Sequence, residues 1–293
     1  MHTLSPSRRV FVVLNYAFLG LLGFLCVAPL VHVMAISFSS SSAATAGDVM
    51  LWPVDFTLKS YEYILERPEF KNAFLVTLQR VALGTIVNML LTIIIAYPLS
   101  KEASAFRFRT AYAWYFVVTI LFSGGLIPWY MTVKETGLLD SIWALVLPGA
   151  VPVFNVILLL NFFRGLPKAL EESAFIDGAG HWKTLWLIYV PLSLPAMATI
   201  ILFTVVGHWN SWFDGLILMN KPENYPLSSY LQTVLFKISL TGLSPQQMMD
   251  LAEVSNRTTK AAQVFVGALP ILLVYPFLQR FFIKGIVLGS VKE

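Results

Sequence analysis

Long apolar stretches separated by short polar segments dominate this chain of 293 residues. A helix that crosses the hydrocarbon core of a bilayer needs about 20 mostly apolar residues. Six stretches are of about that length, and the pattern predicts an all-α integral membrane protein in which residues 1–293 form a single transmembrane domain. The expected transmembrane helices cover residues 10–36, 81–99, 111–130, 142–163, 185–207 and 261–283.

The composition agrees with a chain that places most of its surface in lipid. Hydrophobic residues make up 57% and charged residues 12%, with a mean hydropathy of +0.72, whereas a soluble domain is about 25% charged. A water-soluble enzyme, a disordered tail and a collagen-like rod are therefore excluded. The net charge of +4 is too small to favour nucleic acid, so we expect membrane lipid as a partner and no nucleic acid. Cys26, the one cysteine, lies in an apolar run and is expected to be a buried structural residue.

Lysine and arginine are concentrated in alternate loops. With the N-terminus inside, the inside segments hold 11 of the 20 basic residues in about 56 positions, and the outside segments hold the other 9 in about 108. Cytoplasmic loops carry this excess in membrane proteins, so both termini are predicted to be cytoplasmic. The inside segments are residues 1–9, 100–110, 164–184 and 279–293.

Two outer loops, residues 37–80 and 208–260, are long enough to form structure of their own. The first contains the Trp52-Pro53 turn and a helical pattern at residues 58–65. The second opens with apolar residues at helical spacing, which predicts one amphipathic helix at the interface or against a partner. Those residues are Trp209, Trp212, Phe213, Leu216 and Ile217.

The chain lacks the residues that would power transport or perform catalysis. Residues 178–184 end in Lys-Thr, but Trp182 stands where a phosphate-binding loop requires glycine. No histidine has a second metal ligand at helical spacing, and the predicted helices hold essentially no ionisable groups. Arg80, at an outer edge, is expected to extend towards water. We therefore expect no catalytic residue, no metal site and no cofactor in this chain.

The inside loop at residues 164–184 has the pattern of a short helix. Pro167 suits the first helical residue, and Gly178 suits a helix end, which gives about eleven residues and roughly 16 Å. Glu171, Glu172 and Asp177 form an acidic face, opposite a face with Leu166, Leu170 and Ala174. The residues alone are equally consistent with a solvated connecting loop.

This loop resembles the EAA loop of ABC importer membrane subunits. The resemblance rests on Glu172-Ser173-Ala174, on Gly178-Ala179 and on the Ile188-x-Val190-Pro191 that follows, with Ser173 and Val190 as departures from the family pattern. Other segments resemble the carbohydrate-uptake class, and within it the membrane subunits that import complex oligo- or polysaccharides, those of the alginate importer among them. They include Leu51-Trp52-Pro53, Ala96-Tyr97-Pro98, Ser123-Gly124-Gly125, Phe154-Asn155-Val156 and Phe282-Ile283-Lys284.

The resemblance implies a non-catalytic, multi-pass permease subunit that belongs to a heteromeric complex in the bacterial inner membrane. Its partners would be a second homologous membrane subunit, a cytoplasmic ATPase dimer that binds ATP and Mg, and an extracytoplasmic solute-binding protein. The loop helix would be the coupling helix that contacts the ATPase. The residues implied in coupling are Glu171, Glu172, Ser173, Ala174, Asp177, Gly178 and Ala179.

The cargo implied is a saccharide that crosses by alternating access. Hydrogen-bonding and aromatic side chains near the fourth and fifth predicted helices are candidates for the pathway, although packing or interfacial anchoring explains them as well. These candidates are Asn155, Trp209, Asn210 and Trp212.

Two alternatives come from other functional classes. A stand-alone secondary transporter or channel would carry cargo without an ATPase and would show an internal repeat, which the sequence lacks. A membrane enzyme would need a catalytic constellation, and none is present.

Overall fold

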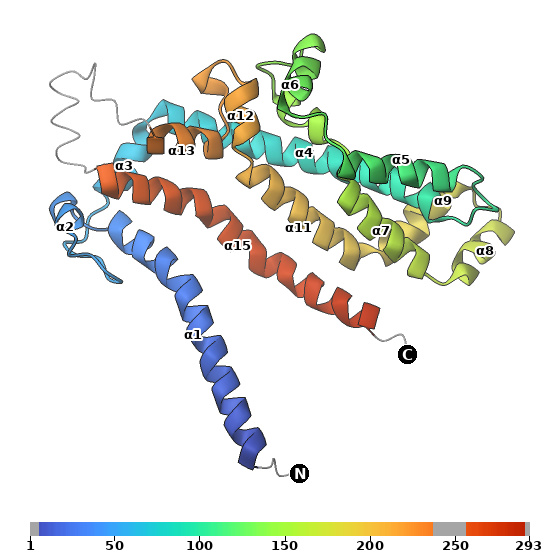
Figure 1. The fold of residues 1–293 in the computed structure, drawn as a ribbon, viewed down its shortest axis with the longest axis horizontal. Coiled ribbons are helices and arrows are strands. Elements are labelled where there is room, and N and C mark those ends of the chain that lie inside the picture. The colour runs from blue at the N-terminus through green and yellow to red at the C-terminus, as the bar shows by residue number, and fades with distance from the viewer. Residues whose placement is uncertain (1–5, 237–255, 291–293) are drawn as a thin grey trace. The chain divides into compact units, whose positions relative to one another are not determined.

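The computed structural model describes residues 6–236 and 256–290, and within them every regular element is a helix (Figure 1). The long helix α1, Pro6–Ser37, covers the predicted segment 10–36. Helix α4, Pro68–Ser100, covers segment 81–99 but begins 13 residues earlier. Helix α15, Asn256–Ser290, contains segment 261–283. By length and composition, the residues searched hold two helices able to cross a membrane, or up to five if each bent pair counts as one.

The predicted segment 111–130 is bent rather than straight. Helix α5, Arg109–Leu121, and helix α6, Leu126–Glu135, meet at 114°. Gly125 between them has φ +87°, a left-handed conformation that side chains other than glycine rarely adopt. The break is therefore encoded in the paired glycines before α6.

The segment 142–163 is also broken. Two 3₁₀ turns, η1 at Ile142–Leu145 and η2 at Leu147–Gly149, precede helix α7, Val153–Gly165, with a bend of 49°. Pro148 and Pro152 lie at this junction, and a proline has no N–H with which to continue an α-helical ladder.

The segment 185–207 starts with a π-helical turn and a short α-helix before the long regular helix begins. Helix α9 (His181–Thr184), the π-helical turn η3 (Leu185–Tyr189) and helix α10 (Val190–Leu192) join helix α11 (Leu194–Asn210) at 81°. Pro191 and Pro195 flank the bend, which explains its position.

The two segments predicted as outer loops confirm one expectation and correct another. Helix α3, Lys59–Glu66, lies at the predicted positions 58–65 and follows the short helix α2, Ser41–Ala46. The single amphipathic helix expected from Trp209 onwards is wrong, since α11 ends at Asn210 and helix α12, Phe213–Leu218, starts anew. The carbonyl of Ser211 at the gap accepts hydrogen bonds from Arg80 and Ser228 instead of continuing a helix.

The rest of the second predicted outer loop contains the 3₁₀ turn η4, Pro222–Asn224, and helix α13, Leu227–Phe236. The predicted loop positions 237–255 lie outside the described residues.

The chain divides into two compact units. The first comprises Met1–Phe70 and Thr233–Leu269, and the second Lys71–Gln232 and Pro270–Glu293. In the first, Arg257 donates a hydrogen bond of 3.0 Å to the carbonyl of Ala44 in α2. Cys26 is exposed, contrary to expectation, because α1 is buried only near its Ser37 end.

The core of the second unit lies where α4, α7, η3 and α11 meet. Figure 1 shows α5, α7 and α9 gathered towards the Ser100 end of α4. Because α7 and η3 both belong to this core, they hold the two ends of the loop between them in place. The buried members are Met89, Ile93, Ala96, Tyr97, Leu99, Val156, Leu159, Leu160, Phe163, Leu185, Tyr189, Met197 and Ile200.

Gly84 allows α4 to approach α11 closely, and a side chain there should destabilise the second unit. A Cβ at this position would overlap the His208 imidazole, so Gly84→Ala is expected to cost about 1–3 kcal/mol of unfolding free energy, measured by denaturant titration in detergent. Gly20→Ala in α1, where a Cβ meets nothing within 4 Å, is the control. Equal stability of the two variants would contradict the close contact.

Candidate functional site

The predicted loop helix is present as α8, Lys168–Ile176, directly after Pro167. Gly178, with φ +79°, turns the chain back at its end. In this conformation the Gly178 N–H donates to the Phe175 carbonyl at 3.0 Å and the Ala179 N–H to the Ala174 carbonyl at 2.9 Å. These bonds satisfy carbonyls that the last turn would otherwise leave free, and glycine has no Cβ to oppose the turn.

Glu171 points into the protein, which corrects the prediction that it belongs to an exposed acidic face. Its carboxylate accepts hydrogen bonds from Lys101 Nζ at 2.5 Å and from the Tyr189 hydroxyl at 2.6 Å. Burial raises the pKa of Glu171, but these hydrogen bonds outweigh burial and leave the pKa below its usual value. Glu171 is therefore an anionic anchor that ties α8 to α4 and η3.

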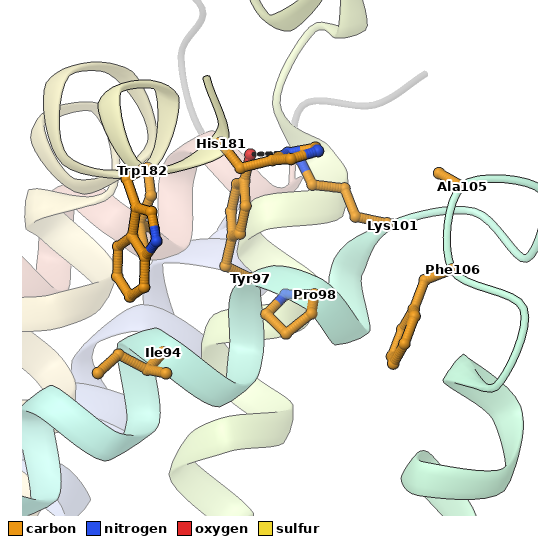
Figure 2. A pocket seen from close by; sticks show the side chains of 9 residues that line it. Ile94, Tyr97, Pro98, Lys101, Ala105, Phe106, His181 and Trp182 are labelled. Atoms are coloured by element: carbon orange, nitrogen blue, oxygen red, sulfur yellow. Dashed lines mark hydrogen bonds between the residues drawn. The ribbon is translucent and has the colours of Figure 1, made fainter. Parts of the chain in front are cut away.

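Aromatic rings surround the cation of this anchor. Lys101 Nζ lies 3.9 Å from the ring centroid of Tyr97 and 4.2 Å from that of Tyr189. The Tyr97 hydroxyl is 3.1 Å from His181 Nδ1 in α9, as Figure 2 shows. Tyr97, Lys101 and His181 border a cavity of about 360 Å³, with Pro98, Phe106 and Trp182 among its other lining residues. We call Tyr97, Lys101, Glu171, His181 and Tyr189 the anchor cluster.

The remaining residues implied in coupling lie in α8 and in the turn that follows it. Ala174 is buried and Ala179 is half-buried, while Glu172, Ser173, Asp177 and Gly178 are exposed. Ile176 is 85% exposed, and Leu170 and Phe175 are also exposed. Apolar side chains beside acidic ones on a surface are typical of a docking site for another protein.

A second site, lined by polar groups, lies in a cavity of about 490 Å³ between α4, α7 and α11. Asn155, 5% exposed, lines it and donates to the Thr204 hydroxyl at 3.3 Å. The other pathway candidates do not line this cavity. Trp209 is buried with its ring edge-on to Phe74. The polar and aromatic residues that line the cavity of about 490 Å³ are Arg80, Asn88, Trp129, Asn155, Phe203, Thr204, His208, Ser211 and Asp214.

Trp212 and Asn210 also lie outside the cavity lining. Trp212 packs edge-on against Phe213, and Asn210 is exposed at the end of α11. Tertiary structure therefore brings one of the four pathway candidates, Asn155, into the cavity.

Arg80 is 2% exposed, so the prediction that it extends towards water is wrong. Helix α4 begins 12 residues before it and carries it against the gap between α11 and α12. There both its terminal nitrogens bind Asp214, and one also donates to the Ser211 carbonyl at 3.1 Å. Within the described part of the chain, the buried Nε of Arg80 has no hydrogen-bond partner. The sequence held a signal for this ion pair, because Arg80 directly precedes the second apolar stretch and Asp214 follows the fifth.

Asn88 joins three elements around the same cavity. Its Nδ2 donates to the carbonyls of Gly149 and Ala150 at 2.7 and 2.9 Å, and its Oδ1 lies 2.6 Å from His208 Nε2. Sequence reasoning missed Asn88 and His208, because a lone amide and a lone imidazole carry no spacing pattern.

Removal of one member of the Arg80–Asp214 pair should be more harmful than replacement of both. Asp214→Asn leaves a buried guanidinium without its counter-charge and is expected to cost about 3–5 kcal/mol. The double variant Arg80→Met/Asp214→Leu is expected to remain within about 1 kcal/mol of the parent in denaturant titrations. Glu223→Gln removes a carboxylate from the exposed Lys221–Glu223 pair and, as control, should change stability by less than about 1 kcal/mol.

The anchor cluster should limit local opening of α8. In Glu171→Gln, amide hydrogen exchange at residues 168–176 is expected to be about tenfold faster, because a charge-assisted hydrogen bond is lost. The matched control is Glu172→Gln, the exposed neighbour. In the parent, this protection is present above the usual carboxyl pKa and is lost as pH falls through the lowered pKa of Glu171. Unchanged exchange in Glu171→Gln would refute the anchor.

The family model described as "Binding-protein-dependent transport system inner membrane component" matches residues 86–287. The chain is 39% identical to Protein LplC of Bacillus subtilis (strain 168), over 100% of this chain and 99% of that protein. It is also 39% identical to the polygalacturonan/rhamnogalacturonan transport system permease protein YtcP of the same organism, over 98% of this chain and 99% of that protein.

A solved structure has the same fold. A chain of a bacterial ABC transporter involved in the import of the acidic polysaccharide alginate matches with a TM-score of 0.89 and 29% identity, over 96% of this chain and 100% of that chain.

Proposed function

Because the chain belongs to the family of binding-protein-dependent transport system inner membrane components, we propose that it forms half of the translocation pathway of an ATP-driven saccharide importer. Membership makes it a permease subunit of an ABC importer. The observation that carries the mechanical part of the proposal is α8, a short helix held to α4 and η3 by the anchor cluster. A push on such a helix is transmitted to the helices that it is tied to.

The substrate class is proposed from the relatives. One is named for polygalacturonan and rhamnogalacturonan transport, and the matching structure is titled for alginate import. We propose an oligo- or polysaccharide as cargo, with alginate as one candidate. The cavity with Asn155 supports this, since amides, hydroxyls and the Trp129 and Phe203 rings are the groups that hold sugars by hydrogen bonds and aromatic faces.

The proposed topology has six transmembrane helices with both termini in the cytoplasm of a bacterium, in its inner membrane. In that orientation α8 faces the cytoplasm, where an ATPase dimer would bind ATP and Mg. The exposed residues Glu172, Asp177 and Ile176 would contact it. A second homologous membrane subunit would complete the pathway, and an extracytoplasmic solute-binding protein would deliver the sugar. The bent helices support alternating access, because breaks allow their halves to reorient.

A variant in the turn after α8 tests the coupling. Gly178→Asp and Gly137→Asp place the same side chain on glycines with φ +79° and +70°, neither of which has an atom within 4 Å of an added Cβ. Both substitutions cost similar backbone strain, of order 1–3 kcal/mol. Gly178→Asp is expected to abolish ATP-dependent uptake in proteoliposomes that contain the complete complex, with insertion intact, whereas Gly137→Asp should retain most uptake.

Glu172→Lys is a second variant that tests the coupling. We expect it to lose uptake, because the substitution reverses the charge of the proposed ATPase contact. Normal ATP-coupled uptake by both Gly178→Asp and Glu172→Lys would refute the coupling role. Saccharide flux through liposomes that contain this chain alone would instead support a stand-alone transporter or channel. Purification in mild detergent should recover an ATPase and a second membrane subunit together with the chain.

A further inference from the structure

Two arginines at the Ser100 end of the second unit line the same two cavities. Arg109 opens α5 and Arg164 is in the last turn of α7, and the Arg109 charge repels that of Arg164. Within residues 6–236 and 256–290, neither forms an ion pair. Arg109 donates to the Lys101 carbonyl at 3.2 Å, and Arg164 donates to the Leu99 carbonyl at 3.0 Å.

The two guanidinium groups retain free donors. Each guanidinium has five N–H groups, and one such bond each leaves most of them unused. The Nε of Arg109 is buried and has no hydrogen-bond partner among the residues that the structure describes. Two guanidiniums with spare donors that border the same cavity can bind a phosphate oxyanion with several charge-assisted hydrogen bonds. Such an anion would also relieve their mutual repulsion.

Both arginines border two cavities of opposite character. On one side is a space of about 520 Å³ with polar lining residues that include Ser100, Ser104 and Lys168. Of the three carboxylates there, Glu171 and Glu102 are paired with Lys101 and Lys168, and Glu172 is exposed. On the other side is a groove of about 330 Å³ along α5 and α7. Its apolar lining residues include Ala113, Trp114, Phe116, Val117, Val156, Ile157 and Leu160.

The apolar groove has the length of one leaflet. It follows residues 109–117 of α5 and 153–164 of α7, which at 1.5 Å per residue is roughly 12–17 Å. Half of a hydrocarbon core of about 30 Å is about 15 Å. An acyl chain in the groove would therefore bring a headgroup phosphate to the level of the two arginines.

We propose that Arg109 and Arg164, with the groove between α5 and α7, form a binding site for one anionic phospholipid. The phosphate lies between the guanidiniums, the glycerol headgroup meets Ser100 and Ser104, and one acyl chain lies along the groove. Basic pockets between transmembrane helices are known to bind such headgroups. The site is independent of the cargo, and the proposed topology enters only in the choice of the cytoplasmic leaflet.

The test measures lipid retained by the purified complete complex. The complex is reconstituted in nanodiscs of equal phosphatidylglycerol and phosphatidylcholine, returned to mild detergent, and its bound lipids are counted by native mass spectrometry. The parent should retain phosphatidylglycerol selectively, at about one molecule for this chain. Arg109→Gln/Arg164→Gln should lower the selectivity roughly tenfold or more, since each basic residue near an anionic surface contributes about fivefold.

Two further variants keep the result interpretable. Arg107→Gln removes an exposed arginine from the same loop that lines neither cavity and should retain the parent's selectivity. Arg109→Lys/Arg164→Lys keeps both charges and should retain most of it. Equal selectivity in the parent and in the glutamine double variant, with both complexes intact, would overturn the proposal.

A photoreactive phosphatidylglycerol with a diazirine on its acyl chain identifies the occupant. Cross-links are expected at residues 113–117 and 156–161 and should be competed by unlabelled phosphatidylglycerol but not by inorganic phosphate. Competition by inorganic phosphate would assign the site to a free anion instead, and absence of cross-links in the complete complex would mean that a partner subunit covers the groove. Either result would overturn the lipid assignment.

Discussion

The Glu171 carboxylate is held between the Lys101 ammonium and the Tyr189 hydroxyl, and the position of α8 depends on these contacts. A helix of nine residues is marginal by itself in water, so it needs such contacts to keep one orientation. Lys101 directly follows the last residue of α4, and Tyr189 belongs to η3. Both α4 and η3 contribute to the main core of the second unit. Because the anchor is charged and partly buried, it resists displacement more firmly than an exposed pair such as Lys168–Glu102.

The breaks in the apolar segments are a second feature of the fold that depends on polar side chains. Gly125 and the prolines at positions 148, 152, 191 and 195 end hydrogen-bond ladders inside three predicted segments. The polar cavity forms at one of these breaks, where Pro148, Gly149 and Pro152 line it. Asn88 donates hydrogen bonds to two carbonyls of this break, those of Gly149 and Ala150. Arg80 uses the carbonyl of Ser211 in the same way. Irregular backbone is thus tolerated where polar side chains or a cavity satisfy it.

Sequence patterns predicted much of the fold and part of the candidate site. The continuous apolar runs predicted α1, α4 and α15, and Pro167 with Gly178 predicted α8, because backbone restrictions of these residues act locally. Asn155 was the one pathway candidate that reached the cavity. The helix expected from Trp209 was wrong, because hydrogen bonds from Arg80 and Ser228 to the Ser211 carbonyl interrupt it, and periodicity carries no information about such distant partners.

Apolar length and composition by themselves determined that this is a helical membrane protein, Pro167 and Gly178 indicated its short loop helix, and the loop motif carried the family resemblance. Tertiary structure alone decided that Glu171 faces inward whereas Glu172 faces outward, and that Arg80 is buried against Asp214. The physical reason is that helical segments follow from interactions within a few residues. The burial and pairing of a charge depend instead on groups 70 to 134 residues away, which come together only when the helices pack.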